Sequence, residues 1–333
     1  MSRDRGPHRL HRHHRNTLTA AALALLALPA SGCVVVHGER EVLPATSEAE
    51  AAEALRKFTT AYNKADKAYD SSFDAAYVTG PLGDMDEARL NAGHVNHPAG
   101  NPAHTPLKFA DVEYTIPEKA GWPRWFLADA RANRGDDDRW LMVFTRDGLD
   151  ERWEVSYLTV VDPGKVPEFK LGEDGFAEAL PADSPELAVS PKDLSRDYAT
   201  YLEDGGNGFA PGPHTTDWRA EREKKETRPG LATQYMDEPL TGGDYDPVAL
   251  RTADGGALVF FTTRHFVKQT AAAGASVPTP NKNVLALTTG EIKQSLTMEF
   301  VSNQVALTPE RGAGDAGVNV LGRIQGLTSA KGE

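Results

Sequence analysis

The first thirty-three residues constrain this chain most, because they indicate a segment that is removed before the rest of the chain folds. Residues 1–16 carry five arginines and a single acid, and the run from Leu18 to Leu28 is apolar apart from Thr19. This run is too short to span a bilayer, which takes about 20 apolar residues, but it matches the apolar region of a signal peptide. A buried helix would show polar positions at helical spacing, and this run shows no such pattern. We therefore predict that residues 1–32 are a signal peptide.

Cys33 is the only cysteine of the chain, and it directly follows the small residues Ala30, Ser31 and Gly32. This arrangement resembles the lipobox of bacterial lipoproteins. In that family the cysteine thiol receives a diacylglyceryl group and cleavage makes the cysteine the new N-terminus, which implies lipidation of Cys33 here. Ala30 departs from the family pattern, because leucine is commonest three residues before the cysteine. An ordinary signal peptidase would also accept this segment, so the alternative is a secreted protein with one free thiol.

A single cysteine cannot form an internal disulfide, so the thiol needs another explanation, and acylation supplies one. Two acyl chains anchor a protein stably where one chain is marginal. We predict that residues 33–46 are a lipidated tether, that the lipid bilayer is a partner through Cys33, and that the protein lies at the outer face of the cell membrane. Without residues 1–32 the chain has 31 basic and 47 acidic side chains. Such an acidic surface is repelled by nucleic acid, which we do not expect as a partner.

Residues 47–161 are predicted to form a first α+β domain. Ser47 followed by Glu50 is a capping box, and an apolar stripe at helical spacing continues from there to Phe73. The Gly80-Pro81 pair is predicted to end this segment, before a short helix at 84–92. Alternating apolar residues then predict a strand at 112–116, and three further runs predict strands at 125–132, 140–146 and 153–161.

Residues 162–189 contain four prolines and no long periodic run, so they are predicted to be a linker. Residues 190–327 are predicted to form a second α+β domain, followed by a flexible tail at 328–333. Its predicted helices are 192–202 and 218–227, and its predicted strands are 248–251, 257–268, 284–287, 296–307 and 318–324. The predicted fold class is α+β, with two domains that each pack a long helix on a curved antiparallel sheet.

This order of elements resembles the nuclear-transport-factor-2-like, or ketosteroid-isomerase-like, cone fold in each half of the chain. The resemblance covers most of residues 47–161 and 190–327, and it is one of element order, without a family motif matched residue by residue. In its signal, tether and tandem layout the chain also resembles uncharacterised lipoproteins of high-GC Gram-positive bacteria. The cone fold implies an architecture only, because one fold carries many functions.

Three histidines lie close together in the segment GHVNHPAGNPAH, and they are His94, His97 and His104. Imidazoles at this density can bind zinc or copper. The segment has no cysteine or carboxylate, however, and its proline and glycine content favours a loop in which the histidines are incidental. We therefore predict no metal site, and these three histidines are the candidates should a metal be bound.

The tryptophans are the candidate binding residues. Trp125, Trp140 and Trp153 would stack on a sugar or on a partner's apolar side chains if they lined an exposed sheet face, and they are ordinary core residues otherwise. Carboxylates for acid–base chemistry would need an apolar pocket. Asp129, Glu154 and Glu299 fall in predicted strands, where outward-facing charges are the simpler interpretation.

No catalytic motif stands out in the chain. It has no nucleophile elbow, no phosphate-binding loop before a helix and no zinc-protease helix. We predict neither a catalytic residue nor a cofactor. The favoured function is a membrane-anchored extracytoplasmic binding module for an envelope ligand or a protein partner. The alternatives are a small cone-fold hydrolase or isomerase that uses a buried carboxylate, and a structural spacer in the envelope.

Overall fold

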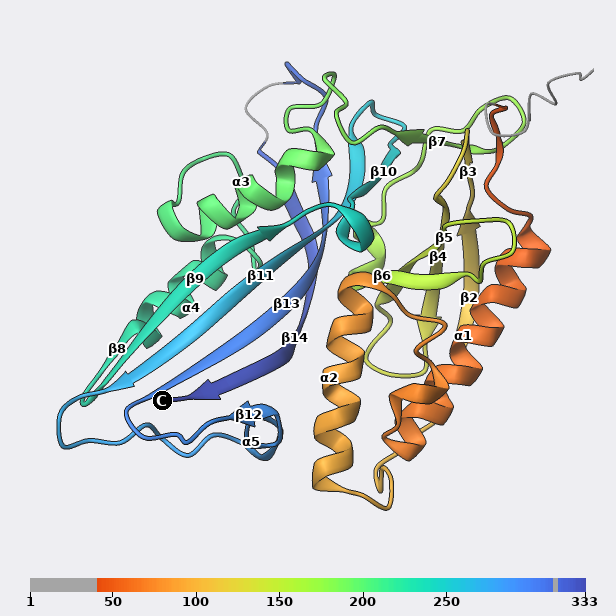
Figure 1. The fold of residues 1–333 in the computed structure, drawn as a ribbon. Coiled ribbons are helices and arrows are strands. Elements are labelled where there is room, and N and C mark those ends of the chain that lie inside the picture. Colours follow the sequence, from red (N-terminus) through yellow and green to blue (C-terminus); the bar gives the residue numbers. More distant parts are fainter. Residues whose placement is uncertain (1–40, 314–316) are drawn as a thin grey trace, which may run out of the picture. The chain divides into compact units, whose positions relative to one another are not determined.

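The computed structural model describes residues 41–313 and 317–333, and within them the chain is a mixed α+β fold with one large and one small β-sheet (Figure 1). The predicted α+β class is therefore confirmed. The predicted signal peptide and Cys33 lie outside the described residues. No helix in the described ranges is both long enough and apolar enough to cross a membrane.

The first half of the described chain holds two long helices and a small sheet. The helices are α1 (Glu48–Ala68) and α2 (Gly80–Asn96). The small sheet has the antiparallel order β2-β4-β5-β6, with β2 (Phe109–Thr115), β4 (Arg124–Ala132), β5 (Arg139–Arg146) and β6 (Glu154–Val161). Strands β4, β5 and β6 lie within one residue of their predicted bounds.

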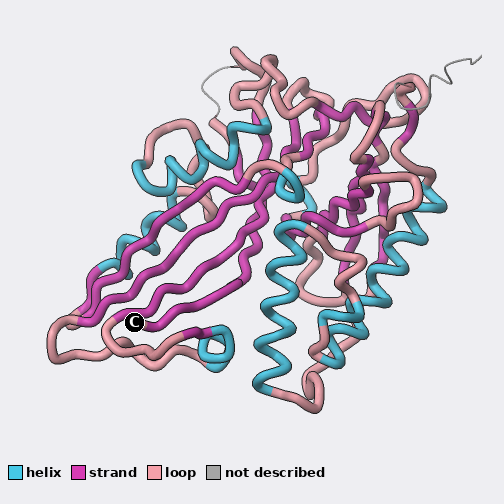
Figure 2. Tube along the Cα trace, in the orientation of Figure 1, coloured by secondary structure: helices cyan, strands magenta, loops and turns pink. Residues whose placement is uncertain are grey.

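The large sheet is built mostly from the second half of the chain. Its order is β1-β3-β7-β10-β11-β13-β14-β12, with β9 paired to β11 and β8 to β9. Its long strands run side by side (Figure 2) and are β9 (Leu231–Leu240), β11 (Ala257–Ala271), β13 (Ser295–Thr308) and β14 (Asn319–Gly332). The shorter strands are β1 (Leu43–Pro44), β3 (Pro117–Lys119), β7 (Ala177–Leu180), β8 (Thr227–Arg228), β10 (Val248–Arg251) and β12 (Thr288–Thr289). The remaining helices are α3 (Pro191–Asp204), α4 (Thr216–Glu226) and α5 (Lys282–Leu287).

Helix α1 begins as the sequence predicts but ends earlier. The Ser47 hydroxyl accepts a hydrogen bond from the Glu50 backbone N–H at 3.2 Å. The Glu50 carboxylate does not complete the capping box, because it accepts from Thr46 at 2.8 Å and from Arg146 and Trp153 instead. At its other end α1 stops because Tyr69 takes a left-handed backbone conformation.

The Gly80-Pro81 pair begins α2, whereas the sequence analysis expected it to end the preceding segment. Proline suits the first turn of a helix, because its missing N–H would have no intrahelical partner there. Helix α2 then runs to Asn96, so the predicted short helix at 84–92 is the middle of a longer one.

Both faces of the small sheet are buried, which explains why residues 125–128 of β4 and 141–144 of β5 are continuous apolar runs. On one face Phe126, Met142 and Phe144 pack with Phe58 of α1. On the other face an apolar cluster joins this sheet to the large one, through Trp125, Leu127, Leu141, Val143 and Tyr157 from the small sheet and Leu250, Leu258, Phe260 and Val305 from the large one.

This shared core bears on the predicted two-domain layout. It joins strands from 47–161 to strands from 190–327, and the described residues form one compact unit. The predicted linker, 162–189, contains β7, which pairs with β3 on one side and β10 on the other. Neither two domains nor a tandem cone fold is confirmed.

Strand β9 was not predicted, and α3 protects its outer edge. The Asp237 backbone N–H donates to the Glu203 carboxylate at 3.1 Å, and the Leu240 N–H donates to the Ser195 hydroxyl at 3.0 Å. A sheet edge whose N–H groups are satisfied by helix side chains cannot recruit another strand there. Helix α3 itself packs the predicted stripe of Leu194, Tyr198 and Tyr201 on the sheet.

Three shorter segments also differ from expectation. Residues 284–287 form part of α5, because Asn281 caps the Val284 N–H and starts a helix; a four-residue apolar run does not distinguish helix from strand. Residues 328–332 belong to β14 and pair with β13, whereas a flexible tail was expected. Residues 43–46, at the end of the predicted tether, include β1 and the buried Ala45.

Candidate functional site

A cleft of about 440 Å³ lies between α2 and the large sheet, and we call it the α2–sheet cleft. Its volume falls in the range of small-molecule sites, which is roughly 300–1,000 Å³. Three kinds of element line it: α2, the strands β9, β11, β13 and β14, and single residues from the loop after β9 and from α5.

One wall of the α2–sheet cleft is a polar stripe of α2. Asp84, Glu87, Ala88 and Asn91 lie three, four and seven residues apart, so they share one side of the helix and face the cleft together. The sequence contains this spacing, but the sequence analysis treated the segment as a short helix and did not consider its polar face.

The opposite wall comes from the sheet. Arg264 of β11 pairs across the sheet with Val301 of β13, and Glu299 of β13 lies opposite Ser329 of β14. The Ser329 hydroxyl donates to Glu299 Oε2 at 2.8 Å, while Glu299 Oε1 lies 3.5 Å from Arg264 Nη1. The polar groups of this wall are therefore held by each other and by strand pairing.

Gly326 of β14 sets how closely the two walls approach. A Cβ atom at this position would lie 2.7 Å from Met85 Cγ and 2.8 Å from Met85 Cβ. Only a glycine therefore lets α2 rest directly on β14, which brings the polar stripe of α2 over the sheet.

Negative charge predominates in the α2–sheet cleft. Its walls carry the carboxylates of Asp84, Glu87 and Glu299 against the single guanidinium of Arg264, and Arg264 already binds Glu238 outside the cleft at 2.5 Å. Tyr245 donates its hydroxyl hydrogen to Asp84 at 2.7 Å. Burial and this hydrogen bond raise the pKa of Tyr245 to about 12, so it remains a neutral donor.

A second, smaller cavity of about 250 Å³ lies beside the first turns of α2, and we call it the Asp74 cavity. Asp84 and Glu87 line both cavities. Asp74 is completely buried, and burial together with the nearby charge of Asp86 raises its pKa to about 8. Both oxygens of Asp74 and the Oδ2 atom of Asp86 are buried without a hydrogen-bond partner in the described structure.

Arg89 connects Asp86 to a third buried carboxylate, Asp66. Its Nη2 atom donates to Asp86 Oδ1 at 2.6 Å, and its Nη1 atom donates to Asp66 Oδ1 at 2.8 Å. Asp66 also contacts the His104 ring, with 2.7 Å between Nδ1 and Oδ2. Burial opposes ionisation of Asp66, but the bonds from His104 and Arg89 outweigh it and lower its pKa.

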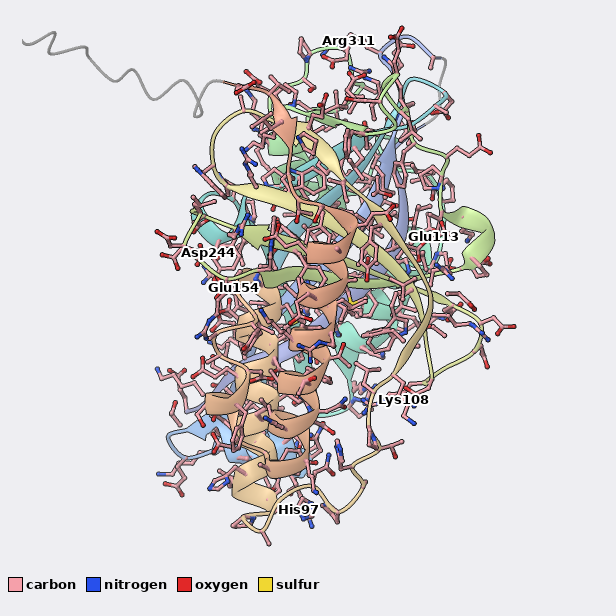
Figure 3. The ribbon with its side chains drawn as sticks, turned by 90° about the vertical axis from the view of Figure 1, so that its right-hand side faces the viewer. His97, Lys108, Glu113, Glu154, Asp244 and Arg311 are labelled. Atoms are coloured by element: carbon pink, nitrogen blue, oxygen red, sulfur yellow. The ribbon has the colours of Figure 1, made fainter. Side chains whose placement is uncertain are left out.

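The three candidate metal-binding histidines have different surroundings in the structure. His104 contacts Asp66. His97 follows the end of α2 (Figure 3), and its ring stacks on Tyr69. His94 is exposed in the last turn of α2. Among the described residues, no group of three or more histidine, cysteine or carboxylate side chains is arranged to hold a metal ion.

The candidate tryptophans lie among apolar residues. Trp125 is buried in the core between the two sheets, and Trp153 is buried on the α1 side of the small sheet. Trp140 is half-buried with its ring edge-on to Phe109. Trp125 and Trp153 thus face opposite sides of one sheet and do not form a common exposed patch.

The three strand carboxylates have different surroundings. Asp129 is buried and accepts from Arg139 at 2.6 Å; burial raises its pKa in spite of that bond. Glu154 lies near Asp244 (Figure 3), and burial followed by neighbouring acids raises its pKa. Only Glu299 lines the α2–sheet cleft. The sequence carries no signal for Asp74 as a site residue, because its burial depends on tertiary packing.

The comparisons with known proteins give a family without a known activity. Residues 42–332 match a family model described as a domain of unknown function, DUF8094. The chain is 67% identical to an uncharacterised lipoprotein of Streptomyces coelicolor and 56% identical to one of Streptomyces avermitilis, each over 333 residues and the full length of both proteins. It is 27% identical to a second uncharacterised lipoprotein of Streptomyces coelicolor over 288 residues, which is 80% of this chain and 78% of that protein. No solved structure matches the chain.

Proposed function

Because this chain belongs to the DUF8094 family, and its relatives in Streptomyces are named lipoproteins, we propose that it is a lipid-anchored protein of the outer face of the cell membrane. We further propose that it binds a positively charged envelope ligand, without catalysis, in the α2–sheet cleft. The observation that carries the binding proposal is the excess of carboxylates over cations in a cleft of about 440 Å³.

The anchor in this proposal is the diacylglyceryl group on Cys33. The sequence around Cys33 resembles a lipobox, and the relatives' names agree with that interpretation. The first described strand begins at Leu43, ten positions after Cys33. At about 3.3 Å per residue this spacer reaches at most roughly 33 Å, which keeps the fold near the membrane surface.

The lining of the α2–sheet cleft suits binding better than covalent catalysis. Its residues include hydroxyls, an amide and carboxylates, but neither a histidine nor a cysteine lines it. A serine or threonine nucleophile normally needs an adjacent base. The Ser329 hydroxyl does contact a carboxylate, that of Glu299, but Glu299 also lies 3.5 Å from Arg264, which favours a structural ion pair over a catalytic base. A ligand that carries an amine and hydroxyl groups would match the carboxylates of Asp84, Glu87 and Glu299 together with the Tyr245 and Ser329 hydroxyls.

We expect the α2–sheet cleft to distinguish an amine from its neutral counterpart. Glucosamine and N-acetylglucosamine share one ring, and only the first carries a positive charge. Because a hydrogen bond to a charged group contributes about 1.5–3 kcal/mol, glucosamine should bind at least about tenfold more tightly. Isothermal titration calorimetry at low ionic strength measures both dissociation constants.

The same titration with Glu87→Gln tests where the amine binds. This variant should lose most of the preference, whereas Glu53→Gln, which changes a half-exposed glutamate of α1 outside the cleft lining, should keep it. Equal binding of the two sugars by the wild type, or an unchanged preference in Glu87→Gln, would contradict the cleft as a cation-binding site.

A further inference from the structure

We propose that the Asp74 cavity is a Ca²⁺ site in which the ion binds the unpartnered oxygens of Asp74 and Asp86. This cavity adjoins the α2–sheet cleft and shares Asp84 and Glu87 with it, but the proposed ligands, Asp74 and Asp86, do not line that cleft, and the proposal does not depend on a ligand there. Its basis is the combination of the burial of Asp74, the missing donors to its oxygens and an adjoining space of about 250 Å³ lined by carboxylates.

The missing partners are the first observation. Asp74 has no solvent exposure, and no N–H or O–H group donates to its carboxylate oxygens in the described structure. The group that they approach is another carboxylate, that of Asp86, which helps to raise the pKa of Asp74. Burying a carboxylate without a partner is strongly unfavourable, so an orphaned buried group of this kind points to an ion or to bound water. The Oδ2 atom of Asp86, which is also buried, lacks a partner as well.

The local charge balance is the second observation. Four carboxylates line the Asp74 cavity, from Asp74, Asp84, Asp86 and Glu87, and no lysine, arginine or histidine lines it. The nearby guanidinium of Arg89 is engaged elsewhere, because it donates to the other oxygen of Asp86 and to Asp66. The charge of Arg89 acts on Asp74 only from a distance, because none of the bonds that Arg89 donates in the described structure reaches the Asp74 carboxylate.

The chemistry of the lining selects the ion. The polar side chains of the lining carry only oxygen atoms, in carboxylates and in the Ser71 and Thr79 hydroxyls, and hard cations such as Ca²⁺ prefer oxygen ligands. Its volume of about 250 Å³ leaves room for water ligands, each of which occupies roughly 30 Å³. Ca²⁺ accepts six to eight ligands in irregular geometry, whereas Mg²⁺ requires a near-ideal octahedron.

With only two fixed carboxylates we expect weak binding. Extracellular calcium modules bind with dissociation constants of about 10⁻⁴–10⁻³ M, and this site should fall in that range. The competing explanation is that Asp74 and Asp86 share one proton, in which case no ion is needed.

Thermal unfolding of the full chain, purified in detergent and treated with EDTA, distinguishes the two explanations. Adding 10 mM CaCl₂ should raise the midpoint of wild-type unfolding by about 5 °C, and MgCl₂ should raise it less. Asp74→Asn should abolish the calcium response, because the amide removes the charge that binds the ion. Asp137→Asn, the same change at an exposed position of the β4–β5 loop, should respond like the wild type.

Two results would overturn the proposal. One is a wild-type midpoint that calcium does not change, which would leave the shared proton as the explanation. The other is an undiminished calcium response in Asp74→Asn, which would place the ion on the acidic surface. If Asp74→Asn does not fold, Mn²⁺ soaked into wild-type crystals decides the matter: an anomalous peak between Asp74 and Asp86 supports the site, and its absence contradicts it.

Discussion

Replacing Arg222 by methionine is expected to lower the free energy of unfolding by about 3–5 kcal/mol, because it leaves a buried carboxylate without its partner. Arg222 of α4 binds Asp237 of β9 with two hydrogen bonds, of 2.5 Å from Nη1 to Oδ2 and 2.9 Å from Nη2 to Oδ1. The exposed fractions of the two side chains are only 7% and 1%. Urea unfolding of the wild type and the variant measures the difference.

The same helix supplies a matched control. Lys224 binds Glu221 at 2.7 Å, but these side chains are 70% and 50% exposed. Lys224→Met should leave the urea midpoint unchanged, because water solvates both charges whether or not they pair. The double variant Arg222→Met, Asp237→Leu should recover much of the lost stability, since it removes the orphaned carboxylate. If Arg222→Met changed the urea midpoint as little as Lys224→Met does, the pair of Arg222 and Asp237 could not be buried under α4 as described.

The second large effect is a loss of stability in mild acid caused by His265. This side chain is 2% exposed on β11, stacks on Phe300 and has no hydrogen-bond partner at Nδ1 in the described structure. Burial, followed by the charges of Arg323 and Arg222, lowers its pKa to about 2. In the unfolded chain the pKa of a histidine is about 6.5.

Between these two pKa values the unfolded chain binds a proton that the folded protein does not. The contribution of neutral His265 to stability is therefore complete above about pH 6.5 and declines as the pH falls toward 2. At pH 5 the decline amounts to about 2 kcal/mol. Burial also lowers the pKa of His214, so this residue adds to the acid sensitivity in the same direction.

Urea unfolding at pH 7.5 and pH 5 measures this effect as a difference within each protein. His265→Leu should lose less stability between the two pH values than the wild type does, even if its stability at pH 7.5 is lower. His97→Gln, which changes an exposed histidine, should keep the wild-type pH dependence. A His265→Leu variant as acid-sensitive as the wild type would mean that His265 is not held neutral in the fold.

The sequence predicts local elements well where one periodic signal predominates. The stripe from Ala51 to Phe58 and the cap at Ser47 predict α1, and runs rich in apolar residues predict β4 and β5. These signals are local, because cap chemistry and periodicity depend on neighbouring residues. Cap chemistry and periodicity do not predict how separate elements pack against each other, so they did not predict the core that joins the two sheets.

Strand β9 shows why part of the fold escapes such reasoning. Its inward-facing positions include Thr233 and Asp237, so apolar alternation is absent even though burial alternates. Asp237 can face inward only because Arg222, fifteen residues earlier in the chain, binds it there. The mixed charges of 218–228 predict surface pairs, and Lys225 does lie 3.8 Å from Glu221, but the sequence does not reveal that Arg222 is buried.

The candidate sites show the same contrast between features that are local in the sequence and features that depend on tertiary packing. Asp84, Glu87 and Asn91 have helical spacing, so a polar face of α2 could be inferred from the sequence once the helix was recognised. Their role as a cleft wall depends on Gly326, which lies more than 230 residues later and lets β14 approach α2. The burial of Asp74 likewise depends on tertiary packing.

The most direct test of the proposed function is the membrane fraction and intact mass of the protein from its native cell, with Cys33→Ala alongside. We predict that the wild type is in the membrane fraction and that its mass corresponds to a chain starting at Cys33 with a diacylglyceryl group. The variant should be released from the membrane without that mass. A wild-type protein that is already soluble and unmodified at Cys33 would contradict the lipid anchor and favour a diffusible secreted protein.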